Sequence, residues 1–194
     1  QPSQANRNRS EYLYEKIKNY EKQSLKSSEN IKITSIACGS AIEIQKYISR
    51  EKLSDNATIT LLDFEKEALH YLKNRLKVIL SENKRSTNLK FVKESIFNML
   101  KNKKSLNKID DEQDIIYSIG LFEYLSIPIC QKLIEALYTK LKKGGLLILG
   151  NYAKGSPFKS WMELGVEWYL IYRNNDELFS MATNIDKNKI GIEQ

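Results

Sequence analysis

Apolar residues in this chain gather in five short runs, and longer segments with a helical spacing of apolar residues lie between them. Within each run nearly every position is apolar, which is typical of strands buried on both faces of a parallel sheet. Strands of this kind in alternation with helices predict one α/β domain with a doubly wound, mostly parallel sheet. The expected strands are residues 31–37, 57–63, 88–92, 114–119 and 146–150.

Three helices are predicted from apolar residues at steps of three or four. One follows the second strand, one follows the fourth, and an extra N-terminal helix over residues 11–22 precedes the first. For the helix after the fourth strand, Ser126 can cap the start, Pro128 falls in the first turn, and Gly144 with Gly145 is expected to end it. The apolar positions of the three helices, in chain order, are Leu13, Ile17 and Tyr20, then Leu69, Leu72, Leu76, Ile79 and Leu80, then Ile129, Leu133, Leu137 and Leu141.

The remaining segments carry weaker patterns. Residues 101–113 are polar and predict a mobile loop. Beyond the fifth strand we expect a helix near residues 156–168, a second near 175–182 and a short last strand near 189–193. No internal repeat or linker interrupts the chain, so all of it is expected to form one domain.

The chain is basic, with 31 Lys and Arg against 24 Asp and Glu. Such a balance can indicate nucleic acid, an acidic carrier protein or an anionic substrate as the partner. The lysines are spread along amphipathic helices and form no dense block, so nucleic acid is the less favoured partner. No apolar run approaches the ~18–20 residues of a membrane span, and two cysteines without a disulfide pattern favour a soluble protein of the reducing cytoplasm.

Candidate chemistry follows the strand ends, because an open α/β sheet binds its ligands beyond the carboxyl ends of its strands. The first strand leads into a turn of small residues, 37–41, around Gly39, where the backbone can approach a ligand closely. The second strand ends in Asp63, 24 residues after Gly39, where a carboxylate can accept hydrogen bonds from both ribose hydroxyls. A cap for the following helix is the alternative role for Asp63. The two features together favour a nucleoside ligand.

Four motifs fall in an order that resembles the class I S-adenosylmethionine-dependent methyltransferases. They are ITSIACGSAIEIQ, TLLDFEKEAL, DIIYSIGLFEYL and LYTKLKKGGLLILGNY, and they lie within residues 31–152. The resemblance implies a Rossmann-like fold, S-adenosylmethionine as the cofactor, and an antiparallel strand hairpin that usually closes the sheet. The first motif departs from the family, which commonly has three glycines where this chain has Ala37, Gly39 and Ala41.

A narrower resemblance extends over nearly the whole chain. The segments ANRNRSEYL, ACGSAIEIQ, YSIGLFEYLS and GNYAKGSPFKSWMELGVEWYLIYRN are similar to bacterial methyltransferases that make 3-hydroxy fatty acid methyl esters, the extracellular-factor signalling group. The resemblance implies an O-methyltransferase whose acceptor is a small-molecule carboxylate, either free or on an acidic carrier protein. Within the single domain 1–194, residues 1–25 would form a helical cap, 31–151 the cofactor-binding core and 152–194 the substrate side.

The expected site residues come from segments that should meet at the strand ends. The expected cofactor contacts are Ala37, Cys38, Gly39 and Ser40 for the methionine part, Asp63 for the ribose, Phe64, Ser95 and Ile96 for the adenine, and Ser118, Gly120 and Leu121 for the opposite side. The expected catalytic residues are Tyr124 and Asn151. The expected substrate contacts are Arg9, Tyr12, Trp161, Trp168, Tyr172 and Arg173. The two tryptophans can instead be core residues and Arg173 a surface charge, and these alternatives stay open.

Other chemistries lack their residues. His70 is the only histidine and is expected at an exposed helix position, and with two distant cysteines the chain offers no metal site. Cys130 follows Ile129, so the Pro-Cys pair of cytosine-C5 methyltransferases is missing. After the fourth strand, residues 118–121 differ from the Asn/Asp-Pro-Pro-aromatic cluster of amino-methylating nucleic-acid enzymes. An RNA or protein methyltransferase and a cofactor-binding domain without activity remain as alternatives.

Overall fold

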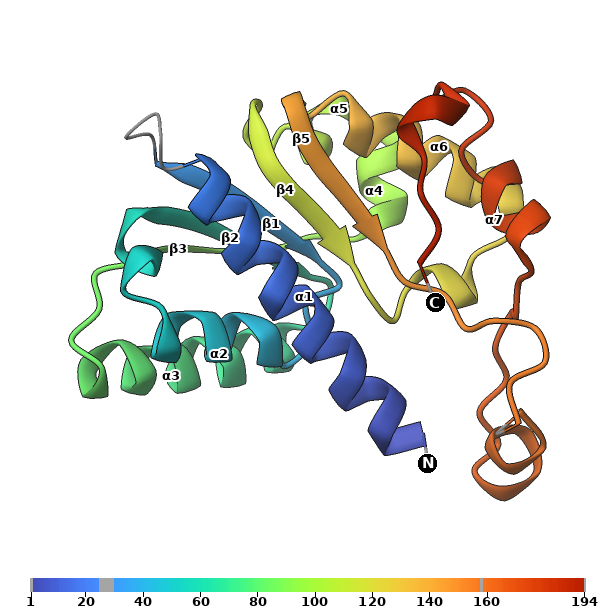
Figure 1. The fold of residues 1–194 in the computed structure, drawn as a ribbon, viewed down its shortest axis with the longest axis horizontal. Helices are drawn as coiled ribbons and strands as arrows, with labels where there is room; N and C mark the ends of the chain where they lie inside the picture. Colours follow the sequence, from blue (N-terminus) through green and yellow to red (C-terminus); the bar gives the residue numbers. More distant parts are fainter. Residues whose placement is uncertain (1, 25–29, 158, 194) are drawn as a thin grey trace.

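The fold is built around a sheet of five parallel strands in the order β3-β2-β1-β4-β5 (Figure 1). The computed structural model describes residues 2–24, 30–157 and 159–193. The strands are β1 (Ile31–Ile36), β2 (Ala57–Asp63), β3 (Asn88–Lys93), β4 (Gln113–Ser118) and β5 (Leu141–Leu149). The strand order reverses between β1 and β4, so the doubly wound sheet expected from the sequence is confirmed, with every pairing parallel.

Helices cover both faces of the sheet (Figure 1). One face carries α1 (Pro2–Ser24), α2 (Ile42–Arg50) and α3 (Lys66–Glu82); the other carries α4 (Ile96–Lys101) and α6 (Ile127–Tyr138), against which α7 (Asn175–Ser180) packs. Successive residues of a strand point to opposite faces, so Ile115 belongs to the first core and Ile116 to the second. Shorter helical turns are η2 (Lys52–Asn56), α5 (Lys103–Leu106), η3 (Phe122–Tyr124), the π turn η4 (Trp161–Gly165) and η5 (Lys187–Lys189).

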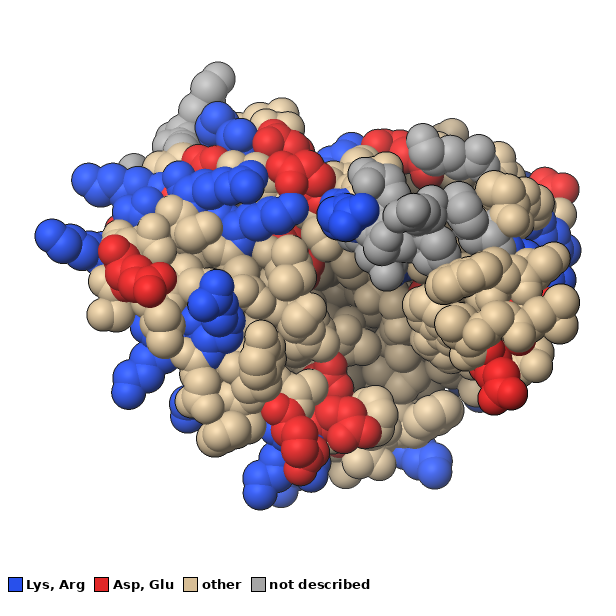
Figure 2. Space-filling view, turned by 90° about the horizontal axis from the view of Figure 1, so that it is seen from below, with Lys and Arg blue, Asp and Glu red and all other residues tan. Residues whose placement is uncertain are grey.

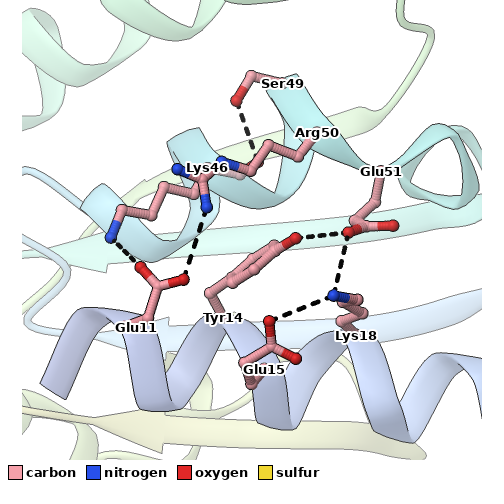
Figure 3. Close-up of polar contacts among 8 residues, drawn as sticks. All are labelled: Glu11, Tyr14, Glu15, Lys18, Lys46, Ser49, Arg50 and Glu51. Carbon is pink, nitrogen blue, oxygen red and sulfur yellow. Dashed lines mark hydrogen bonds and ion pairs between the residues drawn. The ribbon is translucent and has the colours of Figure 1, made fainter. Parts of the chain in front are cut away.

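The predicted N-terminal helix is present as α1 and is longer than the expected 11–22. Its Leu13 and Ile17 are buried in the core shared with α2 and α3. Polar contacts also fasten α1 to α2, where Glu11 pairs with Lys46 at 2.6 Å and with Arg50 at 3.5 Å (Figure 3). Exposed ion pairs contribute little each, so the buried apolar residues provide most of the stability of this contact.

Residues 101–113, predicted as a mobile loop, are instead packed and tied to the rest of the fold. They contain α5, and Ile109 is fully buried. Lys108 pairs with Glu94 at 2.6 Å, and Lys140 pairs with Asp111 at 2.7 Å. A single buried apolar residue among polar ones gives no periodic signal, which is why the sequence pattern did not indicate this packing.

After α6 the chain departs from the predicted elements. Gly144 and Gly145 do not end α6, because they lie inside β5, which begins at Leu141 and pairs with β4 with a shift of register. A single π turn, η4, replaces the helix expected near 156–168, and η5 with an extended end replaces the strand expected near 189–193. The helix expected near 175–182 is confirmed as α7. No strand follows β5 within the described residues.

Candidate functional site

The carboxyl ends of the parallel strands lie at one edge of the sheet, and the molecule is hollowed there. Figure 2, seen from below, shows the hollow between the part that carries α2 and α3 and a lobe formed by residues 152–157 and 159–173. The floor of the hollow and the surface of the lobe are mostly uncharged in this view. Open α/β sheets bind ligands in such a crevice where the strand order reverses, which here is between β1 and β4.

Open space adjoins the two glycines that follow the central strands. Gly39, after β1, and Gly120, after β4, have φ values of +48° and +91°, and a Cβ added to either would meet no atom within 4 Å. Ala37 and Ala41 also have positive φ, at 53° and 42°, a conformation that costs an L-residue roughly 1–2 kcal/mol. The turn therefore keeps a backbone path that favours glycine at three positions. Of the neighbouring predicted contacts, Ser40 is exposed and Leu121 is half-buried.

Asp63 joins the glycine turn to the start of α3. Its Oδ2 accepts the Gly39 N–H at 2.9 Å, and its Oδ1 accepts the Glu65 N–H at 3.0 Å. A carboxylate offers about four lone-pair positions, so two remain for hydroxyl groups of a ligand. The two roles considered for Asp63, ribose contact and local support of the next helix, are therefore compatible.

The turns after β2 and β3 present two exposed aromatic rings. Phe64 is 62% exposed and Phe97 is 50% exposed, although both are large apolar residues. The predicted adenine contacts Ser95 and Ile96 have structural roles. Ser95 Oγ accepts the Phe97 N–H at 3.2 Å as the cap of α4, and Ile96 is buried. Sequence reasoning missed Phe97, which lies in the first turn of α4 beside the predicted pair.

Glu94, directly after β3, also escaped the sequence prediction. Its carboxylate accepts hydrogen bonds from the Ser95 N–H and Asn98 Nδ2, both at 2.9 Å, and pairs with Lys108 at 2.6 Å. These contacts, with Lys108 the largest, lower the pKa of Glu94 to about 2. The ionised side chain fixes the start of α4 next to the exposed rings.

Below the hollow lies a set of buried polar side chains. Ser118 Oγ donates to the Ile36 carbonyl at 2.9 Å, so its hydroxyl links β4 to β1 and does not face a ligand as predicted. Burial raises the pKa of the Cys38 thiol to about 12, which keeps it unreactive. Tyr117 Oη donates to Glu43 Oε1 at 2.7 Å, and burial raises the pKa of Glu43, a residue that sequence reasoning missed.

A second buried acid lies where α1 meets the lobe. Arg9 Nη1 is 3.6 Å from Glu123 Oε1, and the Arg9 guanidinium lies 5.1 Å from the centre of the Tyr152 ring. Glu123 Oε2 is buried without a hydrogen-bond partner among the described residues, and burial raises the pKa of Glu123. Arg9 is thus at the predicted substrate side, whereas Glu123 and Tyr152 were not predicted. The position of Glu123, just after a central strand, was the available signal.

Arg173 and Asn151 support the fold, which corrects the roles predicted for them. Arg173 is 2% exposed, and its guanidinium donates to the carbonyl oxygens of Phe122, at 2.7 Å, and Leu125, and to Asn151 Oδ1 at 2.5 Å. Asn151 Nδ2 donates to two backbone carbonyls at 2.8 and 3.0 Å. Arg173 is therefore neither a surface charge nor open to a substrate, and the Asn151 amide is engaged within the protein.

The remaining residues, predicted as catalytic (Tyr124) or as substrate contacts, are aromatic. Tyr124 is 50% exposed in η3, and its hydroxyl accepts the Trp168 Nε1–H at 2.6 Å. Trp161 is 55% exposed, so it is no core residue, whereas Tyr172 is buried in the lobe and donates to a methionine sulfur at 3.7 Å. Tyr12 donates to a glutamate of the C-terminal segment at 2.8 Å. Tyr124, Trp161 and Trp168 thus keep surface that a ligand can contact.

The family model of a methyltransferase domain matches residues 27–190. The chain belongs to this methyltransferase domain family. The match covers the sheet, the hollow and the lobe, and it confirms the family and the fold expected from the sequence. No curated protein matches the chain.

Solved structures share the fold of this methyltransferase domain at low identity. A candidate O-methyltransferase from Nostoc punctiforme aligns with a TM-score of 0.59 and 15% identity over 86% of this chain and 49% of its own. The small RNA methyltransferase HEN1 gives 0.61 and 16% over 88% and 19%. Magnesium protoporphyrin IX methyltransferase from Synechocystis, with SAH bound, gives 0.60 and 9% over 90% and 69%. The chain thus spans about half the length of the first protein and about a fifth of the second.

Further observations on the methyltransferase domain concern metal ligands, membrane spans and its histidine. In the parts of the chain that the structure describes, no three or more His, Cys, Asp or Glu side chains are grouped to hold a metal ion, and no helix has the length and apolar character of a bilayer span. His70 is exposed on α3, as expected, and contacts Asn74 at 3.1 Å. It borders a separate, open depression on the surface of α3, which has a volume of about 580 Å³ and is lined by residues of α3 alone.

Proposed function

We propose that this methyltransferase domain transfers a methyl group from S-adenosylmethionine to an oxygen of a small-molecule acceptor, and that the acceptor is the carboxylate of a 3-hydroxy fatty acid. The observation that carries the proposal is the hollow at the strand ends, bordered by Gly39, Asp63 and Gly120. The aromatic lobe across the hollow, whose surface is mostly uncharged in the view of Figure 2, and Arg9 beside it support an acceptor that is apolar along its length and anionic at one end.

The residues at the strand ends fit the proposed methyl donor. Gly39 and Gly120 leave bare backbone against open space, Asp63 keeps lone pairs for ribose hydroxyls, and Phe64 with Phe97 offers exposed rings for adenine. When bound, the donor supplies a methyl carbon on a positively charged sulfur, which a carboxylate oxygen can accept without losing a proton. No general base is therefore required of the chain.

The chain's own residues have to align the acceptor and exclude water. Arg9 is the cation placed to orient a carboxylate, since a charge-assisted hydrogen bond is both strong and directional. Tyr152 and Trp168 offer ring surface for an alkyl chain, and each buried CH₂ contributes ~0.8 kcal/mol. Of Arg9 and Arg173, the two arginines that the sequence predicted to contact the substrate, Arg9 is the one to which we assign this role.

Two further parts of the proposal concern the source of the acyl substrate and the cellular compartment of the reaction. The net charge of +7 supports an acidic carrier protein as a source of acyl substrate. Cys38 and Cys130 are buried free thiols, which supports a reducing cytoplasm as the place of the reaction.

The test is methyl transfer from labelled S-adenosylmethionine to 3-hydroxy fatty acids of graded length. We expect the rate at low acceptor concentration to rise with chain length until the hollow is filled. Arg9→Ala should weaken acceptor binding by ~10-fold or more while the affinity for S-adenosylhomocysteine stays the same. Lys22→Ala, which removes an exposed charge from the other end of α1, is the matched control and should change neither.

Three results would contradict the proposed function. They are a rate that is independent of chain length, label that enters RNA or protein instead of lipid, and cofactor binding without any transfer. Binding to RNA that weakens steeply as salt rises would identify the second case, because phosphate contacts release counterions.

A further inference from the structure

The hydrogen bond between Trp168 and Tyr124 has a fixed direction. Trp168 Nε1 lies 2.6 Å from the Tyr124 hydroxyl oxygen. An indole N–H can only donate, so the tyrosine oxygen is the acceptor. The hydroxyl proton of Tyr124 must then point away from Trp168, and it is available to a third group. Because Tyr124 is 50% exposed, that group can come from solution.

The turn that carries Tyr124 is held firmly by the lobe. The Arg173 guanidinium donates to the carbonyl oxygens of Phe122 and Leu125, at the two ends of η3. The Ile171 N–H donates to the carbonyl of the residue before Tyr124 at 2.8 Å. Together with the Trp168 contact, these bonds fix η3 to residues 168–173. The Tyr124 hydroxyl therefore has one well-defined place at the border between the lobe and the end of β4.

A row of contacts connects Tyr124 with Arg9. The Trp168 ring meets the Tyr152 ring edge to face with 6.3 Å between centres, and the Arg9 guanidinium lies 5.1 Å from the centre of the same Tyr152 ring. Two hydrogen-bond donors, the Arg9 guanidinium and the Tyr124 hydroxyl, thus stand at the ends of an aromatic surface. A carboxylate with an alkyl chain matches this arrangement, since its oxygens can accept from a hydroxyl or a guanidinium while the alkyl chain lies against the rings.

We propose that Trp168 is a positioning residue that directs the Tyr124 proton toward the acceptor, and that this pair selects acceptors with a spare oxygen lone pair over amines of the same shape. The inference rests on the proposed function and refines its substrate class. In the transfer, one carboxylate oxygen forms the new bond to carbon while the carbon–sulfur bond breaks and its electron pair stays on sulfur. No proton moves. The second oxygen accepts the Tyr124 proton as a hydrogen bond, whereas a neutral amine has a single lone pair, which the transfer itself consumes.

The test compares the wild type with Tyr124→Phe, Trp168→Phe and the double variant, all loaded with S-adenosylhomocysteine. Calorimetry at neutral pH measures the binding of decanoate and of decylamine, two probes of equal chain length; the amine is then an ammonium ion, which has no lone pair for the Tyr124 proton. We expect Tyr124→Phe to weaken decanoate binding by roughly 10-fold or more, and Trp168→Phe to weaken it by a smaller factor. The double variant should bind decanoate as Tyr124→Phe does, because phenylalanine at position 168 keeps a ring for the alkyl chain and the lost indole N–H acts only through the hydroxyl that Tyr124→Phe lacks.

If Tyr124 and Trp168 had only a structural role, their substitution would also change properties other than decanoate binding. S-adenosylhomocysteine affinity should stay unchanged in the four proteins, and Tyr169→Phe, which removes an exposed hydroxyl from the same lobe, should bind decanoate like the wild type. The inference is overturned if the two losses multiply in the double variant, if decylamine binds the wild type as well as decanoate does, or if the wild type binds neither probe. Selective decanoate binding without methyl transfer would instead contradict the proposed function alone.

Discussion

The proposed cofactor side of the site is formed by the turns after β1, β2 and β3, and there main-chain N–H groups donate to the polar side chains. The proposed acceptor side is formed by Arg9, η3 and the lobe, and there side chains donate to the main chain. Asp63 and Glu94 accept backbone N–H groups from the turns around them. Arg173 and Asn151 do the reverse and donate to backbone carbonyls. The first arrangement follows from the strand-turn-helix unit itself, and the second depends on a few particular residues.

The acids of the two sides differ in the same way. Hydrogen bonds from Lys108 and its neighbours lower the pKa of Glu94 to about 2 on the cofactor side. On the acceptor side, burial raises the pKa of Glu123, which has Arg9 as its charged neighbour. The carboxylate of Glu94, on the cofactor side, is therefore satisfied by Lys108 and by the start of α4. On the acceptor side, Glu123 is a buried acid whose charge is only partly compensated. Single substitutions on each side test this difference.

The largest effect is expected at Gly39. Its φ of +48° is unfavourable for a β-branched residue, and its missing Cβ faces open space, so Gly39→Val should both strain the turn and fill the hollow. We expect affinity for S-adenosylhomocysteine to fall by more than ~100-fold, a change of about 3 kcal/mol, with the helical signal largely kept. Calorimetry and circular dichroism measure both. Normal binding by the valine variant would place the cofactor elsewhere.

The next effect is expected at Arg173 and should fall on the acceptor side. Arg173→Met removes the donors to the Phe122 and Leu125 carbonyls and leaves these buried groups unsatisfied, which should lower the free energy of unfolding by about 3 kcal/mol. Urea denaturation measures this loss. Arg50→Met removes an exposed ion pair to Glu11 and should cost less than ~1 kcal/mol. Equal effects of the two substitutions would show that Arg173 does not clamp η3.

The same contrast explains how far the sequence could predict the structure. The strands β1 to β4 were predicted to within one residue at each end, and β5 was not. The apolar runs of β1, β2 and β4 do correspond to burial on both faces, whereas β3, at the edge of the sheet, is only partly buried. The segments held by side chains gave no such signal. Nothing periodic marks Ile109 as a core residue or Arg173 as a buried donor, and both act through contacts with segments far away in the chain. The strand ends themselves were predictable, and so the sequence drew attention to Gly39 and Asp63; it passed over the acids Glu94 and Glu123, whose burial and partners come from contacts outside the strands.

A third prediction concerns Asp63. Asp63→Ala removes the acceptor for the Gly39 N–H and the proposed ribose contact, and losing hydrogen bonds to a charged group costs roughly 1.5–3 kcal/mol. Affinity for S-adenosylhomocysteine should then fall by ~10–150-fold. The matched control is Asp55→Ala, which removes a carboxylate that also accepts a backbone N–H, but at the opposite end of β2. If a folded Asp63→Ala variant binds as tightly as the control, Asp63 lies outside the site.

A fourth prediction uses the opposite pKa shifts of the two acids. Glu123 has a raised pKa in the folded protein, so its contribution to stability is present at low pH and is lost as pH rises above the ordinary carboxyl range near 4.5. Glu123→Gln mimics the protonated form, and its stability relative to the wild type should therefore increase from pH 4 to pH 8, by about 1 kcal/mol or less.

Glu94 should show the opposite sign. Its folded pKa is lowered to about 2, so its stabilising contribution is present above the unfolded pKa and is lost as pH falls from 4.5 toward 2. Glu94→Gln should be less stable than the wild type at pH 7, and the difference should shrink in acid. Thermal melts of both variants across pH measure these slopes. Parallel slopes for the two variants would refute the contrast between the sides.

The smallest effect is expected at the two alanines of the glycine turn. Ala37 and Ala41 have φ values of 53° and 42°, where glycine avoids a cost of roughly 1–2 kcal/mol. Glycine also makes the unfolded chain more flexible, by ~0.4–1 kcal/mol, and removes a methyl group whose burial is worth ~0.8 kcal/mol. The Ala41 methyl is buried in the core and that of Ala37 is only partly buried.

Ala37→Gly should therefore raise the free energy of unfolding by up to about 1 kcal/mol, while Ala41→Gly should leave it nearly unchanged. Urea denaturation of the two variants side by side decides this, and destabilisation by Ala37→Gly would mean that the turn gains more from the methyl contact than it loses to the backbone.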